Sequence, residues 1–467
     1  MKAYNKINEA VLVSLQAIVG EKNVVTDADK LVTYSQDEVT DSRYQHLPEA
    51  AVFPETAEQV AEIIKLANRE LIPVTPRGAG TGLAAGAAPI YGGIVLGLEK
   101  MNKILEVNAE NMYMVVEAGV KTQDVQTAAK EAGLLYAGDP SSGDNCFIGG
   151  NIATNAGGNK AIKYGTTRQQ VYAIEIVTPT GEITELGGLL NKSTSGYSLE
   201  QLVIGSEGTL GIITKATLKL IPLPQYKMDL LAVFPDAEAA IDTVFKLLKA
   251  GVDPTSLEYM DNGAVKICAR YLKESLPHQQ DGNYLIITIE TNDEDALDDK
   301  AVQIDEICNA NGAIATLVPD SKKIWAARKA FGDAVREESY IHSSEDMVVP
   351  VKHLPHAMKE IAAICAKHSA VGRTVAHAGD GNIHLNILQG DIPAEAWPTK
   401  IDEILEELLA FTYRIGGKMS GEHGIGSKRA KWMHKFADPV QLKMMQAIKK
   451  AVDPNLILNP GTVFLME

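Results

Sequence analysis

The spacing of apolar residues in the first half of the chain predicts alternating helices and short strands. Residues 56–71 place apolar side chains at helical intervals, and Thr56 with Gln59 forms a capping box at their start. A short strand at 72–75 leads into a Gly-rich loop, Pro76 to Gly86. The same pattern predicts a helix at 125–132, and strands at 94–98, 112–117, 173–178, 182–185 and 210–222.

The pattern of apolar and polar residues changes after Pro222-Leu223-Pro224. Alternating strand and helix patterns follow, which indicate a second α+β domain. Further on, residues 375–387 read as strand, tight Gly-Asp-Gly turn and strand. We predict strands at 228–234, 284–290 and 315–318, and helices at 236–250, 296–310, 394–415 and 438–452.

Composition narrows the class of protein. The chain has 467 residues, which suggests two or three domains, and its formal net charge is −16 with no cluster of Lys and Arg. We therefore expect no nucleic-acid partner. Met1 to Gly20 lacks the apolar core of a signal peptide, and no apolar run is long enough to span a membrane. Together with scattered cysteines that form no CxxC pair, this leads us to expect a cytoplasmic protein.

Three Gly-rich segments dominate the first half. In Arg77 to Gly82, small residues let backbone N–H groups converge on an anion. The third glycine of a dinucleotide fingerprint is missing there, because Leu83 occupies its place. The segments 139–158 and 205–213 follow, the first with hydroxyls and amides suited to a flat polar-edged ring. Taken alone, the first segment also fits a surface turn, the second a buried packing segment, and the third the start of a strand.

In this order, the motifs "PRGAGTGL", "GGNIATNAGG", "YG" and "GSEGTLGII" resemble the flavin domain of the vanillyl-alcohol oxidase superfamily over roughly residues 35–222. The resemblance implies FAD, with its pyrophosphate on Arg77–Gly82, its ring edge along Ser141–Asn155 and its adenine near Ile213. No His stands in the first loop, so we expect non-covalent FAD. The implied cofactor-binding residues are Pro76, Arg77, Gly78, Ala79, Gly80, Thr81, Gly82, Gly86, Pro140, Ser141, Ser142, Gly149, Gly150, Ala153, Thr154, Asn155, Gly157, Tyr164, Gly165, Glu207, Gly208, Ile213 and Asn459.

The second half carries candidate catalytic residues. Strand alternation places Asn382, His384 and Asn386 on one face, and His377 stands just before the turn. Two His and Glu422 make a common ligand set for a divalent ion, which leaves the neighbouring His423 for proton abstraction. Oxidation of a 2-hydroxy acid requires such a base, and a bound metal would assist it. The alternative is that both strand His residues only hydrogen-bond within the strand pair.

A carboxylate substrate also needs a cation. Arg328 lies on a predicted helix and could bind a carboxylate through both edges of its guanidinium, although a solvated surface role is the alternative. Here the motifs "WxxR", "HxGDGNxH", "GEHGIG" and "NPG" resemble the glycolate-oxidase D-subunit and D-lactate dehydrogenase group. The resemblance implies His423 as base, Arg328 as carboxylate ligand, Asn386 as a further catalytic residue, and His377, His384 and Glu422 around one Zn, Fe or Mn ion.

Two departures from that group concern the substrate. Thr462 follows "NPG" where many relatives have Lys, and Ser343 to Asp346 lacks the Lys of dicarboxylate-specific relatives. The second departure favours a monocarboxylate, so we expect FAD-dependent oxidation of D-lactate or glycolate, with electrons passed to an electron-transferring flavoprotein or similar soluble carrier. An oxygen-using oxidase and a non-catalytic flavin scaffold, possible as a subunit of a hetero-complex, are the alternatives.

The expected fold is α+β. It comprises a two-part FAD-binding domain of the vanillyl-alcohol oxidase type at 1–225, an α+β cap or substrate domain at 226–411, and a helical C-terminal segment at 412–467 that completes the active site.

Overall fold

The computed structural model describes residues 3–466, which fold into two compact units. Among the described residues, the first unit contains 3–157, 166–223 and 423–466, and the second contains 158–165 and 224–422. The expected boundary near 225 lies close to this division, but the remaining boundaries differ. Residues 412–422 belong to the second unit, and the last segment belongs to the first.

Backbone pairing explains both differences. Val348 pairs with Lys418, and Asp346 with Ser420, so the chain just before Glu422 is attached to the sheet of the second unit. In the first unit, Val74 pairs in parallel with Leu458. The C-terminal segment therefore extends the first unit's own sheet instead of forming a separate part.

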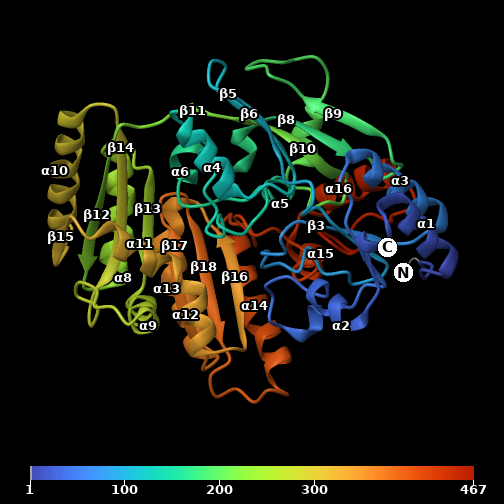
Figure 1. Cartoon of the computed structure of the whole chain (residues 1–467). Helices are drawn as coiled ribbons and strands as arrows, with labels where there is room; N and C mark the ends of the chain where they lie inside the picture. Colours follow the sequence, from blue (N-terminus) through green and yellow to red (C-terminus); the bar gives the residue numbers. More distant parts are fainter. Residues whose placement is uncertain (1–2, 467) are drawn as a thin grey trace. The chain divides into compact units, whose positions relative to one another are not determined.

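The first unit contains two main sheets (Figure 1). One has the strand order β1-β2-β4-β3, with β2, β4 and β3 parallel, and the other has the antiparallel order β5-β6-β10-β8-β9. The strands are β1 (Val24–Val25), β2 (Ala50–Val52), β3 (Val74–Arg77), β4 (Ile94–Gly97), β5 (Ile104–Asn108), β6 (Tyr113–Glu117), β7 (Leu134–Leu135), β8 (Val171–Val177), β9 (Ile183–Gly187), β10 (Ile212–Lys219) and β11 (Ile221–Pro222).

Helices complete the core of the first unit. The apolar stripe of α3, which includes Val60, Ile63 and Ile64, is buried in one cluster with β4, β6, β8 and β10. Thr56 caps α3 by accepting from the N–H of Gln59 at 3.3 Å, as the sequence predicted. The helices are α1 (Glu9–Val19), α2 (Ala28–Leu31), α3 (Ala57–Glu70), α4 (Thr122–Glu131), α5 (Ile148–Thr154), α7 (Leu199–Val203), α15 (Ala430–Phe436) and α16 (Pro439–Val452).

The second unit is built on one antiparallel sheet with the order β15-β12-β14-β13-β17-β18-β16. Figure 1 shows these strands side by side, from yellow-green to orange. The strands are β12 (Tyr226–Phe234), β13 (Ser256–Met260), β14 (Asn283–Thr291), β15 (Ala315–Leu317), β16 (His342–Val348), β17 (Val371–His377) and β18 (Asn382–Leu388).

Helices cover both faces of this sheet. One layer contains α8, α10, α13 and α14, and the opposite core packs α9, α11 and α12 against β12, β13 and β14. Both faces of β14 are therefore covered, which explains why its residues 283–290 are all buried. The helices are α6 (Ala161–Tyr164), α8 (Ala237–Lys249), α9 (Asn262–Leu272), α10 (Glu294–Ala310), α11 (Ser321–Lys329), α12 (Phe331–Glu338), α13 (Leu354–Lys367) and α14 (Trp397–Arg414).

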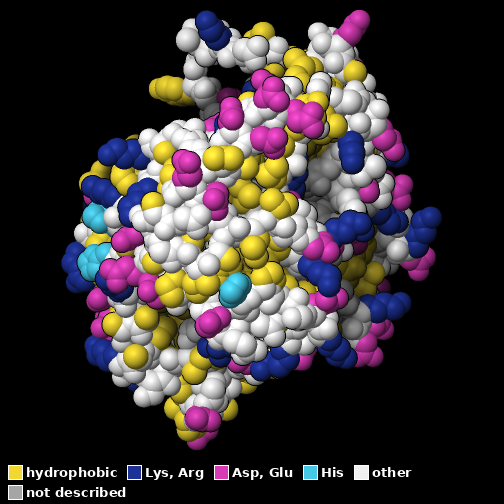
Figure 2. Space-filling model, turned by 90° about the vertical axis from the view of Figure 1, so that its left-hand side faces the viewer, with side chains coloured by type: hydrophobic (Ala, Val, Ile, Leu, Met, Phe, Trp, Pro, Cys, Tyr) yellow, Lys and Arg dark blue, Asp and Glu magenta, His cyan; other side chains and the backbone are white. Residues whose placement is uncertain are grey.

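Surface character agrees with the mixed composition of the chain. On the face shown in Figure 2, Lys and Arg side chains are interspersed with Asp and Glu. Within residues 3–466, no helix combines the length and apolarity needed to cross a bilayer.

Candidate active site

The first predicted cofactor-binding loop follows β3, which ends at Arg77, and the Arg77 side chain lies against this loop. Its guanidinium is buried and donates from Nη1 to the carbonyl of Gln36 at 2.7 Å and from Nη2 to that of Thr33 at 3.3 Å. Gly80 has φ +74°, and a Cβ there would lie 2.1 Å from Arg77 Nη2. Arg77 thus requires glycine at position 80 and holds the loop open.

The backbone of this loop suits an anion. In the described part of the chain, none of the backbone N–H groups of residues 78–82 donates to another protein atom. Gly78 lies beside Gly150 of α5, because a Cβ on Gly78 would be 3.5 Å from the Gly150 Cα. Loop and helix therefore come together within the first unit, and these unpaired donors could hold the pyrophosphate of FAD.

A second junction joins four segments of the first unit through Glu207. Its Oε1 accepts from the N–H of Ile425 at 2.7 Å, and its Oε2 from that of Gly426 at 2.8 Å. Asn459 donates from Nδ2 to the carbonyls of Gly86 at 3.0 Å and of Glu207 at 2.7 Å. Burial raises the pKa of the Glu207 carboxyl. Both side chains brace the segments that surround the first cofactor loop.

Most of the remaining predicted cofactor residues also lie in the first unit. Tyr164 and Gly165 do not: they belong to the second unit, where the Tyr164 hydroxyl donates to Glu290 at 3.0 Å. Their predicted contact with FAD stays a prediction. Those in the first unit are Pro76, Ala79, Thr81, Gly82, Pro140, Ser141, Ser142, Gly149, Ala153, Thr154, Asn155, Gly157, Gly208 and Ile213.

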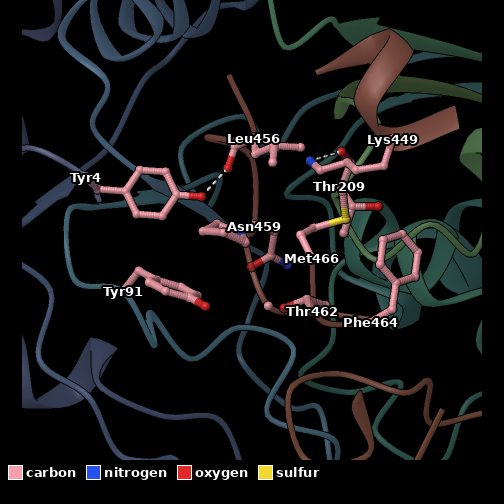
Figure 3. Close-up of a pocket in the computed structure, with 11 residues that line it drawn as sticks. Tyr4, Tyr91, Thr209, Lys449, Leu456, Asn459, Thr462, Phe464 and Met466 are labelled. Carbon is pink, nitrogen blue, oxygen red and sulfur yellow. Dashed lines mark hydrogen bonds between the residues drawn. The ribbon is translucent and has the colours of Figure 1, made fainter. Parts of the chain in front are cut away.

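A pocket in the first unit adjoins the Asn459 junction (Figure 3). Figure 3 shows Tyr4 and Tyr91 on one side of Asn459, and Met466 and Phe464 on the other. On this wall of the pocket, the Tyr4 hydroxyl donates to the carbonyl of Leu456 at 2.5 Å in a partly buried hydrogen bond. The polar cluster described next contributes no residue to this pocket.

That polar cluster lies on β17, β18 and the segment after α14 in the second unit. His377 Nε2 and His384 Nε2 lie 3.3 and 3.2 Å from the same atom, Glu422 Oε1. The two imidazole rings are 5.0 Å apart and nearly perpendicular. The predicted metal ligands are thus brought together, with one ligand atom from each within 4.8 Å of the others.

Electrostatics show that this cluster is suited to positive charge. Burial lowers the pKa of His377, but the Glu258 and Glu422 carboxylates outweigh burial and raise it well above its ordinary value. Burial raises the pKa of Glu422, yet His377 and His384 hold it well below its usual range. A buried site that stabilises an imidazolium next to a carboxylate also fits a divalent ion with two N ligands and one O ligand.

Two carboxylates that the sequence interpretation missed support the cluster. Glu258 on β13 is 1% exposed and accepts from His377 Nδ1 at 2.7 Å. Asp346 on β16 is fully buried and accepts from the backbone N–H of Gly421 and of Glu422 at 3.1 and 3.0 Å. For Glu258 the available signal was a Glu within the mainly apolar segment Ser256–Met260, because an unpaired buried charge is too costly to occur there. Asp346 gave no such signal, because its strand, His342–Val348, is mostly polar in sequence.

The other predicted catalytic residues have different surroundings. Arg328 is buried; its Nε donates to Glu258 Oε2 at 3.0 Å, and its Nη2 forms an ion pair with the same oxygen at 2.8 Å. It is therefore not a solvated helix residue. Asn386 accepts from the Ser344 hydroxyl at 2.5 Å. His423 is the first residue of the last segment of the first unit, directly after Glu422 in the chain.

Comparison with known proteins establishes the class. Residues 48–187 match the model for the FAD binding domain, and residues 223–463 match that for FAD linked oxidases, C-terminal domain. The chain belongs to the FAD-linked oxidases. It is therefore an FAD-linked oxidoreductase, and the match to the FAD-binding model confirms the prediction that FAD is its cofactor.

Particular relatives cover nearly the whole chain. D-lactate dehydrogenase of Anaerostipes hadrus is 36% identical, over 98% of this chain and 98% of its own length. Glycolate oxidase subunit GlcD of Bacillus subtilis is 34% identical, over 95% and 94%. D-2-hydroxyglutarate dehydrogenase of Xanthomonas citri is 32% identical, over 97% and 96%.

Solved structures confirm the α+β fold of the vanillyl-alcohol oxidase type. p-Cresol methylhydroxylase matches with a TM-score of 0.81 at 20% identity, over 97% of this chain and 96% of that one. 4-Ethylphenol oxidase from Gulosibacter chungangensis matches with a TM-score of 0.80 at 18% identity, over 99% of both chains.

Proposed function

We propose that this chain oxidises a small D-2-hydroxy acid, D-lactate or glycolate, to the 2-oxo acid. One observation carries the proposal: His377, His384 and Glu422 converge in the second unit, and Arg328 is linked to them through Glu258. A divalent ion beside a guanidinium is what a vicinal hydroxyl and carboxylate require. Relatives named for D-lactate and glycolate support this substrate class.

The residues would divide the chemistry as follows. His377, His384 and Glu422 would hold a Zn, Fe or Mn ion, whose positive charge would lower the pKa of the substrate hydroxyl. FAD, when bound, would supply the hydride acceptor for the oxidation at Cα. His423 takes the hydroxyl proton, because a neutral imidazole is the default base near pH 7. Arg328 binds the substrate carboxylate, and Asn386 contributes a polar contact.

Charges near β16 support a monocarboxylate. Arg373 on β17 is already paired with Glu338 on α12, at 2.8 Å between Nη2 and Oε1. Residues 343–346 offer no Lys for a second carboxylate. Because one relative is named D-2-hydroxyglutarate dehydrogenase, the dicarboxylate D-2-hydroxyglutarate is included among the substrates to be tested.

We further propose that the reduced cofactor passes electrons to a soluble carrier such as an electron-transferring flavoprotein, and that the enzyme works in the cytoplasm. The relative named as a glycolate oxidase subunit favours a role within a hetero-complex. An oxygen-using oxidase is the alternative, distinguished by peroxide formation in air.

The test of the reaction is anaerobic reduction of the bound flavin, followed by its absorbance. The panel contains D-lactate, L-lactate, glycolate and D-2-hydroxyglutarate. We expect rapid bleaching with D-lactate or glycolate and little with L-lactate. Bleaching by none of the four would overturn the proposal.

The base is tested in the same assay. His423→Asn should retain FAD but reduce it at least about 100-fold more slowly, the usual contribution of a positioned base. The control is His434→Gln, an exposed His on α15, which should react at the wild-type rate. A His423→Asn protein that bleaches at the wild-type rate places the base elsewhere.

A further inference from the structure

Glu258 occupies an unusual position in the second unit. It lies on β13, between β14 and β17, with 1% of its surface exposed. Its two carboxylate oxygens serve different partners. Oε1 accepts from His377 Nδ1 at 2.7 Å, whereas Oε2 accepts from Arg328 Nε at 3.0 Å and lies 2.8 Å from Arg328 Nη2 in an ion pair. One side chain thus connects a residue of the proposed metal site with the proposed carboxylate ligand.

The bond to His377 determines which nitrogen faces the cluster. With Nδ1 turned toward Glu258, Nε2 faces Glu422 Oε1 at 3.3 Å. A histidine that binds a metal commonly donates its other ring N–H to a carboxylate, which fixes the tautomer and the ring orientation. If Glu258 served only to neutralise the charge of Arg328, it would not need to contact His377.

The bond to Arg328 limits the guanidinium in a similar way. Nε donates to Glu258 Oε2 and Nη2 lies in ion-pair contact with the same oxygen, so the side chain is held along one edge. The remaining edge contains Nη1. Because the same carboxylate holds His377, the separation between the guanidinium and the imidazole is fixed by one rigid group on a central strand.

We propose that Glu258 is a positioning residue that sets the spacing between the metal site and the carboxylate ligand, and so selects acids whose hydroxyl and carboxylate stand on adjacent carbons. The inference rests on the proposed function for its substrate and its metal. It adds a separate role, since nothing in the reaction itself requires Glu258 to touch substrate, cofactor or ion.

The experiment compares metal binding and catalysis in Glu258→Gln. Chelator-stripped holoenzyme that retains FAD is titrated with Zn²⁺ in a metal buffer, and bound zinc per chain is measured. We expect zinc affinity to fall about 10- to 100-fold, the usual cost of losing such a partner. The KM for D-lactate should rise as well, because Arg328 loses its fixed orientation, while the FAD content stays at one per chain.

Two further variants separate positioning from a general loss of structure. Arg328→Met leaves the His377 contact in place, so it should raise the KM for D-lactate without weakening zinc binding. Asp229→Asn is the matched control: Asp229 is a buried carboxylate on β12 of the same sheet, paired with Thr288 at 2.5 Å outside the cluster. This control should leave both zinc affinity and KM unchanged.

The outcomes distinguish this inference from the proposed function. If wild-type protein binds zinc and Glu258→Gln binds it equally well, the positioning role is overturned although the metal site stands. Equal loss of zinc affinity in Arg328→Met or Asp229→Asn would also overturn it, because the effect would then be one of folding or charge. If Glu258→Gln loses FAD, Glu258→Asp replaces it, since a shorter carboxylate retains the charge. If wild-type protein binds no zinc, both the positioning role and the proposed metal site are overturned. If wild-type protein binds zinc but fails to oxidise D-lactate, the comparison of zinc affinities still tests the positioning role.

Discussion

Replacing Glu207 by glutamine should release the segment that follows His423. In the wild-type protein the Glu207 carboxylate accepts from the N–H groups of Ile425 and Gly426, at 2.7 and 2.8 Å. Arg429, fully buried behind this segment, donates to the carbonyl of Gly424 at 3.2 Å. The carboxylate is thus the main acceptor for this stretch of backbone.

The magnitude follows from the two hydrogen bonds. Each N–H bond to a charged acceptor contributes about 1.5–3 kcal/mol, and a neutral one about 1 kcal/mol. Glutamine retains one acceptor and turns an NH₂ group toward the second N–H, which leaves that donor unpaired. We therefore expect the free energy that holds the segment closed to fall by about 2–3 kcal/mol, or roughly 30- to 150-fold in the equilibrium.

Hydrogen–deuterium exchange of the Ile425 and Gly426 amides measures this directly. Both amides should exchange about 30- to 150-fold faster in Glu207→Gln, by the same conversion. Flavin reduction by D-lactate should slow in parallel if His423 is the base. Exchange within about threefold of wild type, well under the 1 kcal/mol level, would refute the reasoning.

Four further outcomes are expected. Lys449→Met should lower the free energy of unfolding of the first unit by about 3–5 kcal/mol, measured by urea-induced FAD release, because it leaves the buried Asp453 without its partner at 2.7 Å. Zinc affinity should rise with pH until pH passes the raised pKa of His377, because below that pKa zinc must displace a proton. The raised pKa of His377 also stabilises the metal-free protein at low pH, and this stabilisation is lost as pH rises through that pKa. The lowered pKa of Glu422 contributes stability that is lost as pH falls below about 4.5. Urea unfolding midpoints measured across pH check both effects. Arg328→Lys should raise the KM for lactate at unchanged FAD content, because lysine lacks the planar fork; an unchanged KM would exclude a role in substrate binding.

Elements with strong periodicity were predictable from the sequence. The helix at 57–70, the strand pair 371–377 and 382–388, and the helix at 439–452 lie where apolar spacing placed them. The strand at 256–260 was missed, because all of its side chains are buried and two-residue alternation is absent. The helices at 262–272 and 354–367 were not predicted either.

Within the candidate site, sequence identified the groups that motifs carry but not their supports. His377, His384 and Glu422 were brought together as expected. The contacts of Glu258 and Asp346 with the cluster could not be inferred, because they depend on antiparallel pairing of strands distant in sequence, β13 with β17 and β16 with β18. Contacts of this kind depend on sheet order, which local patterns do not encode.

The return of the chain to its first unit has a consequence for biosynthesis. Val74 on β3 donates its N–H to Ile457 and accepts from Asn459, and Thr209 accepts from Lys449. A nascent chain that has emerged only as far as Glu422 lacks these partners, although all the Gly-rich loops have already been translated. Stable capture of FAD must therefore wait for residues 423–461 to leave the ribosome, and a chain truncated at Glu422 should be colourless.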